Sequence, residues 1–206
     1  SWSTSMQFPP FPRSRILQSC SRKKRKIIIT VQHTESEHHV NRHVGAWGDW
    51  SLTQRGREQA FEIGKQLLRE DCHRGFVMYC SDLKRAVETA EEINKTLCIV
   101  PTLTQQLREV NAGDGNGKSV DWYREHQAPK NGYEPDYKPF PNAESDRELW
   151  NRLYPFCRQL MEGSEERILA VGLLSASPAR VAEDVDVGCP ERKPLIALHL
   201  SGASGH

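Results

Sequence analysis

Two short polar segments of this 206-residue chain carry side chains that could transfer a phosphoryl group. Residues 32–36 (QHTES) place His33 just after an apolar run, and residues 81–90 (SDLKRAVETA) place Arg85 just after another. A neutral histidine nitrogen can attack phosphorus, and arginine presents a planar fork that matches phosphate oxygens. Either motif alone also fits a solvated histidine or a surface arginine on an amphipathic helix. Together they favour chemistry on a phosphate.

The elements that must position these two side chains are strands of a parallel sheet. Residues 27–31 (IIITV) are almost continuously β-branched, as expected for a strand covered on both faces. Ligands of an open α/β sheet bind at the carboxyl ends of its strands. We therefore expect His33 to meet Arg85 at that edge, where Arg85 lies near a helix N-terminus that favours phosphate.

Helices are predicted on either side of these strands. Thr53 should cap a helix with one apolar stripe, and Ser81 should cap a second helix that faces the sheet. A third helix is expected from about residue 145 to 161, kinked at Pro155. The stripe of the first helix comprises Ala60, Ile63, Gly64, Leu67 and Leu68.

Two further strands and a long connection complete the predicted domain. Residues 98–101 and residues 168–172 have the short apolar pattern of strands. The stretch 111–142 is rich in Gly, Pro, Tyr and Asp. Loops of this length are often functional, so it should form a lid or a wall of the substrate site.

Five segments in chain order resemble the histidine phosphatase family, also called the phosphoglycerate mutase-like family. They are residues 32–36 (QHTES), 52–60 (LTQRGREQA), 81–90 (SDLKRAVETA), 107–113 (LREVNAG) and 141–145 (PNAES). The resemblance runs from about residue 26 to 172. It implies an α/β fold in three layers, a mostly parallel sheet with helices on both faces, and a phosphatase that works through phosphohistidine.

The resemblance also assigns roles to individual residues. His33 would be the nucleophile, and Glu109 would protonate the leaving group and then activate water. Arg85 would bind phosphate, and should do so without stabilising the fold. The family has an arginine where this chain has Gln32, and Arg42 is the nearest cation that could compensate.

The chain departs from the family at two further places. Thr34 replaces a glycine, which would let the backbone approach phosphate closely or adopt positive φ. After the strand that ends at Gly172, Leu173 stands where the family carries a second histidine, and no histidine follows until His199. A frameshifted, alternatively spliced or recombined end is one hypothesis for this change. We expect residues 173–206 to leave one flank of the sheet exposed.

The predicted organisation is therefore a core with two unusual ends. Residues 1–25 should be a disordered extension, residues 26–172 the histidine phosphatase-like domain, and residues 173–206 an atypical segment replacing the end of the domain. The net charge of +1 and the lack of a membrane-length apolar run favour neither nucleic acid nor membrane. The basic run 22–26 (RKKRK) is more often a solvated gatekeeper before a strand.

Metals and cofactors are not expected. The six cysteines show no C-x-x-C spacing, which suits neither a zinc site nor a disulfide framework and favours a reducing cytoplasm. Four histidines lie close together in the sequence: His33, His38, His39 and His43. Their segment is predicted to be a loop, without the i,i+4 helical spacing that metal sites often use.

The function favoured by the sequence is hydrolysis of a small phosphomonoester, with impaired activity. A mutase is less favoured, because it must retain and return the phosphoryl group in a closed site. The alternative is a catalytically inactive phosphate-binding or interaction protein, or a defective gene product, and Gln32 and Leu173 support it. Nucleic-acid binding would rest on residues 22–26 alone, without aromatic side chains on which bases could stack.

Overall fold

A parallel sheet forms the centre of the computed structural model, which describes residues 26–70, 74–132, 134–172 and the backbone of 196–200. Its strands run in the order β3-β2-β4-β1-β5, and every neighbouring pair is parallel. The bounds of the strands are β1 Ile27–Gln32, β2 Phe76–Ser81, β3 Pro101–Thr104, β4 Arg167–Gly172 and β5 Ile196–Leu200.

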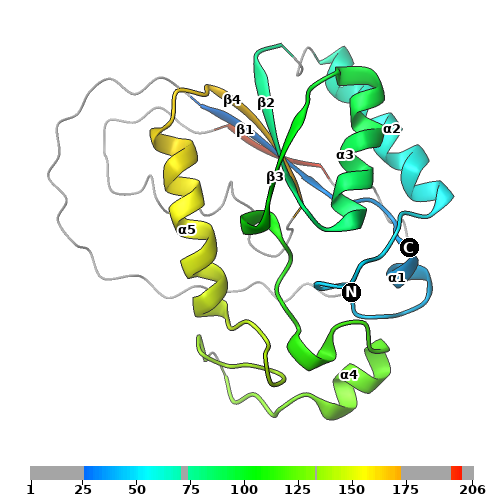
Figure 1. Ribbon diagram of the computed structural model, residues 1–206, viewed down its shortest axis with the longest axis vertical. Coiled ribbons are helices and arrows are strands. Elements are labelled where there is room, and N and C mark those ends of the chain that lie inside the picture. The colour runs from blue at the N-terminus through cyan, green and yellow to red at the C-terminus, as the bar shows by residue number, and fades with distance from the viewer. Residues whose placement is uncertain (1–25, 71–73, 133, 173–195, 201–206) are drawn as a thin grey trace, which may run out of the picture.

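Helices cover both faces of this sheet, as Figure 1 shows, with α2 and α3 on one side and α5 on the other. The bounds of the helices are α1 Glu37–Val40, α2 Gln54–Arg69, α3 Lys84–Leu97, α4 Val120–His126 and α5 Asp146–Glu162, and short 3₁₀ turns span η1 Gln105–Leu107 and η2 Gly113–Gly115. The predicted three-layer α/β architecture is confirmed.

Two apolar cores fill the spaces between the layers. The α2 and α3 helices bury Ala60, Leu67 and Ile93 against the β1, β2 and β4 strands. On the other face, Phe156 and Leu160 of α5 pack against β1 and β4. Burial of this kind is the main force that holds the layers together, at about 25 cal/mol per Å² of apolar surface removed from water.

The strand register brings the carboxyl ends of β1, β2 and β4 to the same edge of the sheet. Gln32 of β1 lies opposite Gly172 of β4, and Cys80 of β2 lies opposite Val171. The residues that follow β1 and β2 therefore emerge at the same edge. Figure 1 shows α1 and α4 beyond this edge, and an isolated bridge joins His43 to Ser119, the residue before α4. That the stretch 111–142 walls the substrate site stays a prediction.

Of the predicted helix caps and stripe residues, the cap at Thr53 is confirmed, whereas the cap at Ser81 and the burial of Leu68 are wrong. The Thr53 side chain accepts a hydrogen bond from the Gly56 N–H and caps α2, as predicted. Ser81 does not cap α3, because β2 extends through it; its hydroxyl accepts from the N–H of Leu83, the residue before the helix. Leu68 is 42% exposed, so it lies outside the buried stripe of α2.

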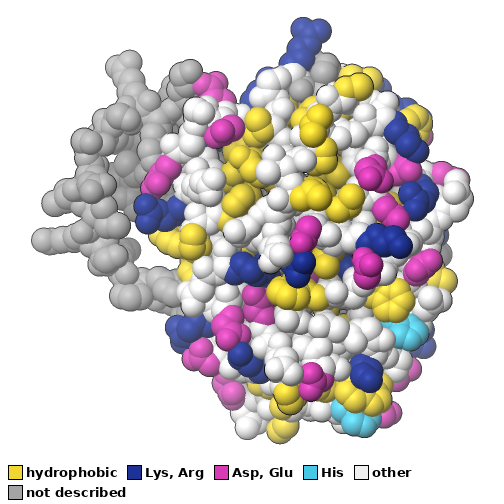
Figure 2. All heavy atoms as spheres, in the orientation of Figure 1, with side chains coloured by type: hydrophobic (Ala, Val, Ile, Leu, Met, Phe, Trp, Pro, Cys, Tyr) yellow, Lys and Arg dark blue, Asp and Glu magenta, His cyan; other side chains and the backbone are white. Residues whose placement is uncertain are grey.

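The strand expected at residues 98–101 begins later. The α3 helix continues to Leu97, and Cys98 then takes a left-handed conformation with φ of 56°. The chain can turn there and enter β3 only at Pro101. The β3 strand is an edge of the sheet, and Figure 2 shows hydrophobic side chains gathered over β2 and β3 on this face.

The sheet continues beyond β1, so the expectation of an exposed flank at this side of β1 is wrong. Strand β5 pairs with β1 in parallel, with Ile27 opposite Ile196 and Val31 opposite Leu200. A strand needs only backbone pairing and a short apolar run, and neither requires the periodic pattern sought in residues 173–206. The predicted disordered extension 1–25 and residues 173–195 and 201–206 lie outside the described residues.

Within the ranges that the structure describes, none of the helices combines the length and the apolar character that crossing a membrane requires.

Candidate active site

A small cavity lies at the carboxyl edge of β1, β2 and β4. Its lining residues are His33, Ser81, Leu83, Arg85, Ala86, Leu107, Glu109 and Gly172. The cavity has a volume of about 10 Å³, which is the room that one water molecule needs. A single oxygen atom of a ligand fits this space, while the rest of the ligand would lie at the mouth. The structure thus brings together three of the residues predicted from the sequence.

His33 is buried at this cavity in a defined tautomer. Its Nδ1 lies 3.0 Å from the Thr34 carbonyl oxygen, which can only accept, so Nδ1 carries the hydrogen and Nε2 keeps its lone pair. Burial lowers the pKa of His33 well below 6.5, and the charge of Arg85 lowers it further. The ring is therefore neutral near pH 7 and has the electronic form of a nucleophile.

Arg85 is the largest fully buried side chain among the described residues, at 1% exposure. Its Nη2 donates to the Ala46 carbonyl at 2.7 Å, and its Nη1 donates to the Gly48 carbonyl at 3.1 Å. Burial lowers the pKa of Arg85 to about 10, and Glu109 opposes this shift. The side chain stays charged near pH 7.

Two consequences follow from the surroundings of Arg85. First, its Nε is buried and has no hydrogen-bond partner in the described part of the chain. A buried cation with an unfilled donor suits an anionic ligand. Second, the bonds to Ala46 and Gly48 tie the loop before α2 to α3. We therefore expect Arg85 to stabilise the fold as well, whereas the sequence analysis expected it to bind phosphate alone.

The replacement of a family glycine by Thr34 is accommodated without backbone strain. Positive φ angles occur among described non-glycine residues at Arg42, Ala46, Cys98 and Asn142, and Thr34 is not one of them. The Thr34 N–H donates to the Thr89 hydroxyl at 3.3 Å, and the two hydroxyls lie 3.4 Å apart. This pair of threonines joins the end of β1 to the first turns of α3.

Glu109 forms another part of the lining and is half-buried. Its Oε1 accepts a hydrogen bond from the Val110 N–H at 2.9 Å, and its backbone carbonyl accepts from the Trp47 indole at 2.7 Å. These bonds fix the position of the residue between the strand ends. A carboxyl group placed here can exchange a proton with a ligand bound in the cavity.

Gln32 and Arg42 lie outside the cavity lining. Gln32 is the half-buried last residue of β1. The Arg42 guanidinium lies 3.3 Å from the Asp121 carboxylate, and its side chain is 69% exposed. Its role as a compensating cation stays a prediction of the sequence. Leu173 follows directly after the lining residue Gly172 and lies outside the described residues.

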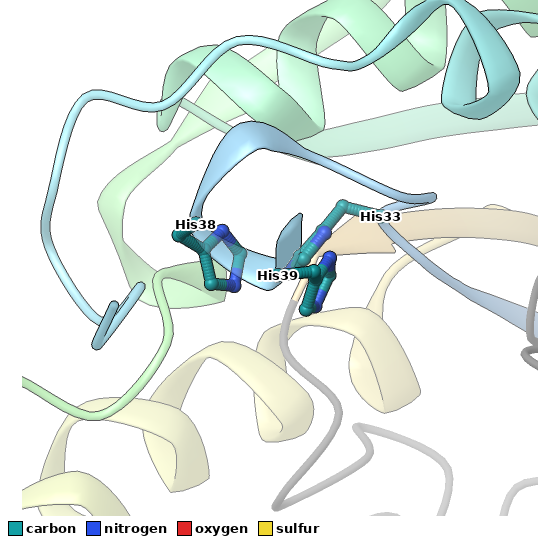
Figure 3. A group of neighbouring side chains, drawn as sticks. All are labelled: His33, His38 and His39. Atoms are coloured by element: carbon teal, nitrogen blue, oxygen red, sulfur yellow. The ribbon is translucent and has the colours of Figure 1, made fainter. Parts of the chain in front are cut away.

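Two neighbouring histidines were missed by the sequence analysis. Residues 37–40 form the one-turn helix α1 rather than the expected loop, and this turn directs His38 and His39 back toward His33 (Figure 3). The ring centroids of His33 and His39 are 5.4 Å apart, and those of His38 and His39 are 3.9 Å apart. A helix this short leaves too little periodicity to be found in a sequence.

Of the two neighbouring histidines, His38 is the buried one. Its Nδ1 lies 2.7 Å from the Ser36 hydroxyl. Burial lowers the pKa of His38 to about 3, and His39 and Arg85 contribute to the shift. One ligand nitrogen from each of His33, His38 and His39 lies within 4.8 Å of the others. The loop expected for this segment is therefore wrong, while the absence of a metal stays a prediction.

Comparison with known proteins gives a consistent set of relatives. The model of the histidine phosphatase superfamily (branch 1) matches residues 28–172. The 2,3-bisphosphoglycerate-dependent phosphoglycerate mutase of Bartonella henselae is 29% identical over 140 residues, which are 64% of this chain and 66% of the relative. The corresponding protein of Bartonella bacilliformis is 30% identical over 139 residues, with the same shares. The match thus spans just under two thirds of the length of these relatives.

A solved structure extends the likeness to the fold. A mycobacterial glucosyl-3-phosphoglycerate phosphatase superimposes with a TM-score of 0.61 at 21% sequence identity. The superposition covers 78% of this chain and 79% of that protein. At this level of identity the similarity is evidence of a common fold.

Proposed function

This chain belongs to the histidine phosphatase superfamily, and from that premise we propose that it hydrolyses a small phosphomonoester through a phosphohistidine on His33. One observation carries the proposal. A neutral histidine with its Nε2 lone pair and a buried arginine with an unfilled N–H line the same cavity. A nucleophile and a fixed positive charge are the two requirements of phosphoryl transfer, which depends mainly on positioning and charge neutralisation.

The reaction would proceed in two balanced steps. The His33 Nε2 lone pair forms a bond to phosphorus while the bond from phosphorus to the leaving oxygen breaks, and Glu109 gives that oxygen a proton. Glu109 then takes a proton from water, whose oxygen attacks phosphorus as the bond to His33 breaks. Arg85 would stabilise the charge on the phosphoryl oxygens in both steps.

A second function is supported by Gln32, which provides a neutral amide where the family has a charge. Loss of one electrostatic partner typically costs about 10²–10³ in rate. Under this alternative the chain binds a phosphorylated molecule without turning it over. We place either function in the cytoplasm, because Cys80, Cys98 and Cys157 are free thiols.

Turnover of an aryl phosphate separates the two functions. Hydrolysis by the parent chain and by His126→Ala, with none by His33→Ala, is expected for the phosphatase; His126 is an exposed histidine on α4, stacked on Trp122. Orthovanadate binding without any turnover would establish the inactive alternative. Adding Leu173→His to the series measures the effect of the absent second histidine, and a large gain in rate is expected.

A further inference from the structure

We propose that Asn131 is a site of spontaneous deamidation, at which the protein forms isoaspartate without the help of an enzyme. The chain contains two asparagines that are followed by glycine, Asn131 before Gly132 and Asn116 before Gly117. Deamidation is fastest in such pairs, because glycine has no side chain to shield its backbone nitrogen. The structure exposes the first pair and holds the second by hydrogen bonds. The reaction requires no turnover by the protein, so it goes beyond the proposed hydrolysis.

Deamidation at this pair begins with an attack by the backbone on the side chain. The nitrogen of Gly132 gives its proton to water and bonds to Cγ of Asn131, while the side-chain nitrogen takes up a proton and leaves as ammonia. The product is a succinimide ring. Water then adds to one of the two ring carbonyls and breaks the bond from that carbon to the Gly132 nitrogen. Attack at Cγ gives aspartate, attack at the backbone carbon gives isoaspartate, and either product carries a new negative charge.

The surroundings of Asn131 leave the reacting groups accessible. Asn131 and Gly132 are both exposed and lie outside the helices and strands. Within the described residues, no hydrogen bond holds the Asn131 amide or the Gly132 N–H. A side-chain carbon placed on Gly132 would meet no atom within 4 Å. The backbone nitrogen and the Asn131 side chain therefore have the room that ring closure requires.

The loop that carries this pair is closed at its base. The Ala128 N–H donates to the Pro139 carbonyl at 2.9 Å, and the Tyr137 hydroxyl donates to the Ala128 carbonyl at 2.5 Å. The Lys130 ammonium lies over the Tyr137 ring, 5.0 Å from its centroid. None of these contacts involves residues 131–132. The methylene that isoaspartate adds to the backbone can thus be accommodated there, and we expect the rest of the fold to stay as it is.

Asn116 is held at both partners of the same reaction. Its Oδ1 accepts from the backbone N–H groups of Trp47 and Ala112, each at 3.2 Å. The attacking nitrogen, that of Gly117, donates to the Val44 carbonyl at 3.2 Å. These bonds must open before the ring can close at Asn116. At the usual net strength of a hydrogen bond, the need to open them slows this pair by about 100-fold relative to Asn131.

The new charge changes the behaviour of the whole chain. The formal net charge at pH 7 is +1, so one added carboxylate brings it to 0. Proteins without net charge associate more readily than charged ones. We therefore expect the deamidated form to separate from the parent in isoelectric focusing and to be the less soluble of the two.

Incubation of the folded chain at physiological temperature and slightly alkaline pH tests the proposal. Cleavage after glutamate places the two asparagines in separate peptides, residues 110–125 and 126–144. Mass spectrometry then measures the loss of amide at each asparagine, and an isoaspartyl methyltransferase labels the isoaspartate. We expect Asn131 to react about 100-fold faster than Asn116.

Two controls separate the effect of the structure from that of the sequence. Asn131→Ser cannot form the ring, so the label on residues 126–144 should disappear, and thermal melting confirms that this variant is folded. Incubation in guanidinium chloride removes the hydrogen bonds around Asn116. Both asparagines precede glycine, so in the unfolded chain they should react at similar rates.

Each outcome supports or overturns the proposal, whether or not the chain hydrolyses a phosphate. Faster reaction of Asn131 in the folded chain, lost on unfolding, supports it. Equal rates in the folded chain, or a faster reaction at Asn116, overturn it. A preference for Asn131 that persists in guanidinium chloride would come from the flanking sequence and would overturn the role of the structure. Loss of amide without isoaspartate would indicate direct hydrolysis by water and would overturn the succinimide route.

Discussion

The two sides of the cavity are held in place by different means. The arginine wall, residues 81–89, carries a buried charge whose donors reach the carbonyls of Ala46 and Gly48, 37 to 39 residues away in the chain. In the histidine wall, residues 33–39, the rings hydrogen-bond to Thr34 and Ser36, at most three residues away. A buried charge needs distant partners that the whole fold positions, whereas a neutral ring can be fixed by its neighbours. Changes in the first wall should affect stability, and changes in the second should affect protonation and ligand contacts.

Removing the nucleophile should give the largest effect. His33→Ala should lower turnover of an aryl phosphate by about 10⁴–10⁶, as removal of a nucleophile does in other enzymes. Stability should fall less than in Arg85→Ala, because the described hydrogen bond of the His33 ring goes to the adjacent Thr34 carbonyl. Steady-state assay and thermal melting measure the two quantities. An acid-labile phosphoenzyme that survives in His33→Ala would contradict the assignment.

The arginine wall should respond in both activity and stability. Arg85→Ala should lower the rate by about 10²–10³ and the free energy of unfolding by about 2–4 kcal/mol, since two carbonyls lose their donors and a cavity is left. Urea unfolding and vanadate titration measure these effects. Arg85→Lys restores the charge without the fork, so it should recover binding only in part. Unchanged unfolding of Arg85→Ala would remove the distinction between the walls.

The histidine wall should make stability depend on pH below 6.5. His33 and His38 have folded pKa values below the unfolded value of 6.5, and that of His38 is about 3. The unfolded chain binds their protons first, so stability present above pH 6.5 is lost as the pH falls toward 3, by up to about 1.4 kcal/mol per pH unit for each histidine.

Urea unfolding between pH 7.5 and 4.5 measures this slope, and His38→Gln should reduce it. Carboxylates make little contribution in that range. The pKa of Asp82, for example, is lowered by its hydrogen bond with Arg108, so its contribution is lost only below about pH 3.8. A flat profile from pH 7.5 to 4.5 would show that the histidines are not held neutral.

A change outside both walls should have the smallest effect. Ser145 caps α5 by accepting from the Glu148 N–H, and Glu148 accepts from the Ser145 N–H in return. Ser145→Ala should cost about 1 kcal/mol of stability and leave turnover unaltered. Thermal melting with a parallel assay tests this, and a marked fall in turnover would show that α5 is coupled to the cavity.

The sequence predicted the parts of the site that follow strand ends. His33, Arg85 and Glu109 could be found because each belongs to a segment with a recognisable pattern, and the structure places all three on one cavity. The position of His39 beside His33 could not be found, since it depends on a single helical turn. The tie from Arg85 to the loop at Ala46 was missed for a similar reason, because no local pattern records a contact 39 residues away.

The same reasoning separates the predicted from the unpredicted parts of the fold. The β1, β2 and β4 strands were evident from continuous apolar runs, and the cap of α2 from Thr53. The β5 strand was not, because its five residues follow a long stretch without periodicity. The error at residues 98–101 arose because the apolar pattern gives no sign of the left-handed turn at Cys98.

The pairing of β1 has a consequence for the order in which the chain can assemble during its synthesis. This first described strand hydrogen-bonds only with β4 and β5 among the described elements, and those strands begin at Arg167 and Ile196. While the ribosome is still adding the intervening residues, residues 27–32 have neither neighbour in place. A nascent chain must keep this β-branched segment from aggregating for most of translation, and chaperone capture is expected to be greatest before residue 167 emerges.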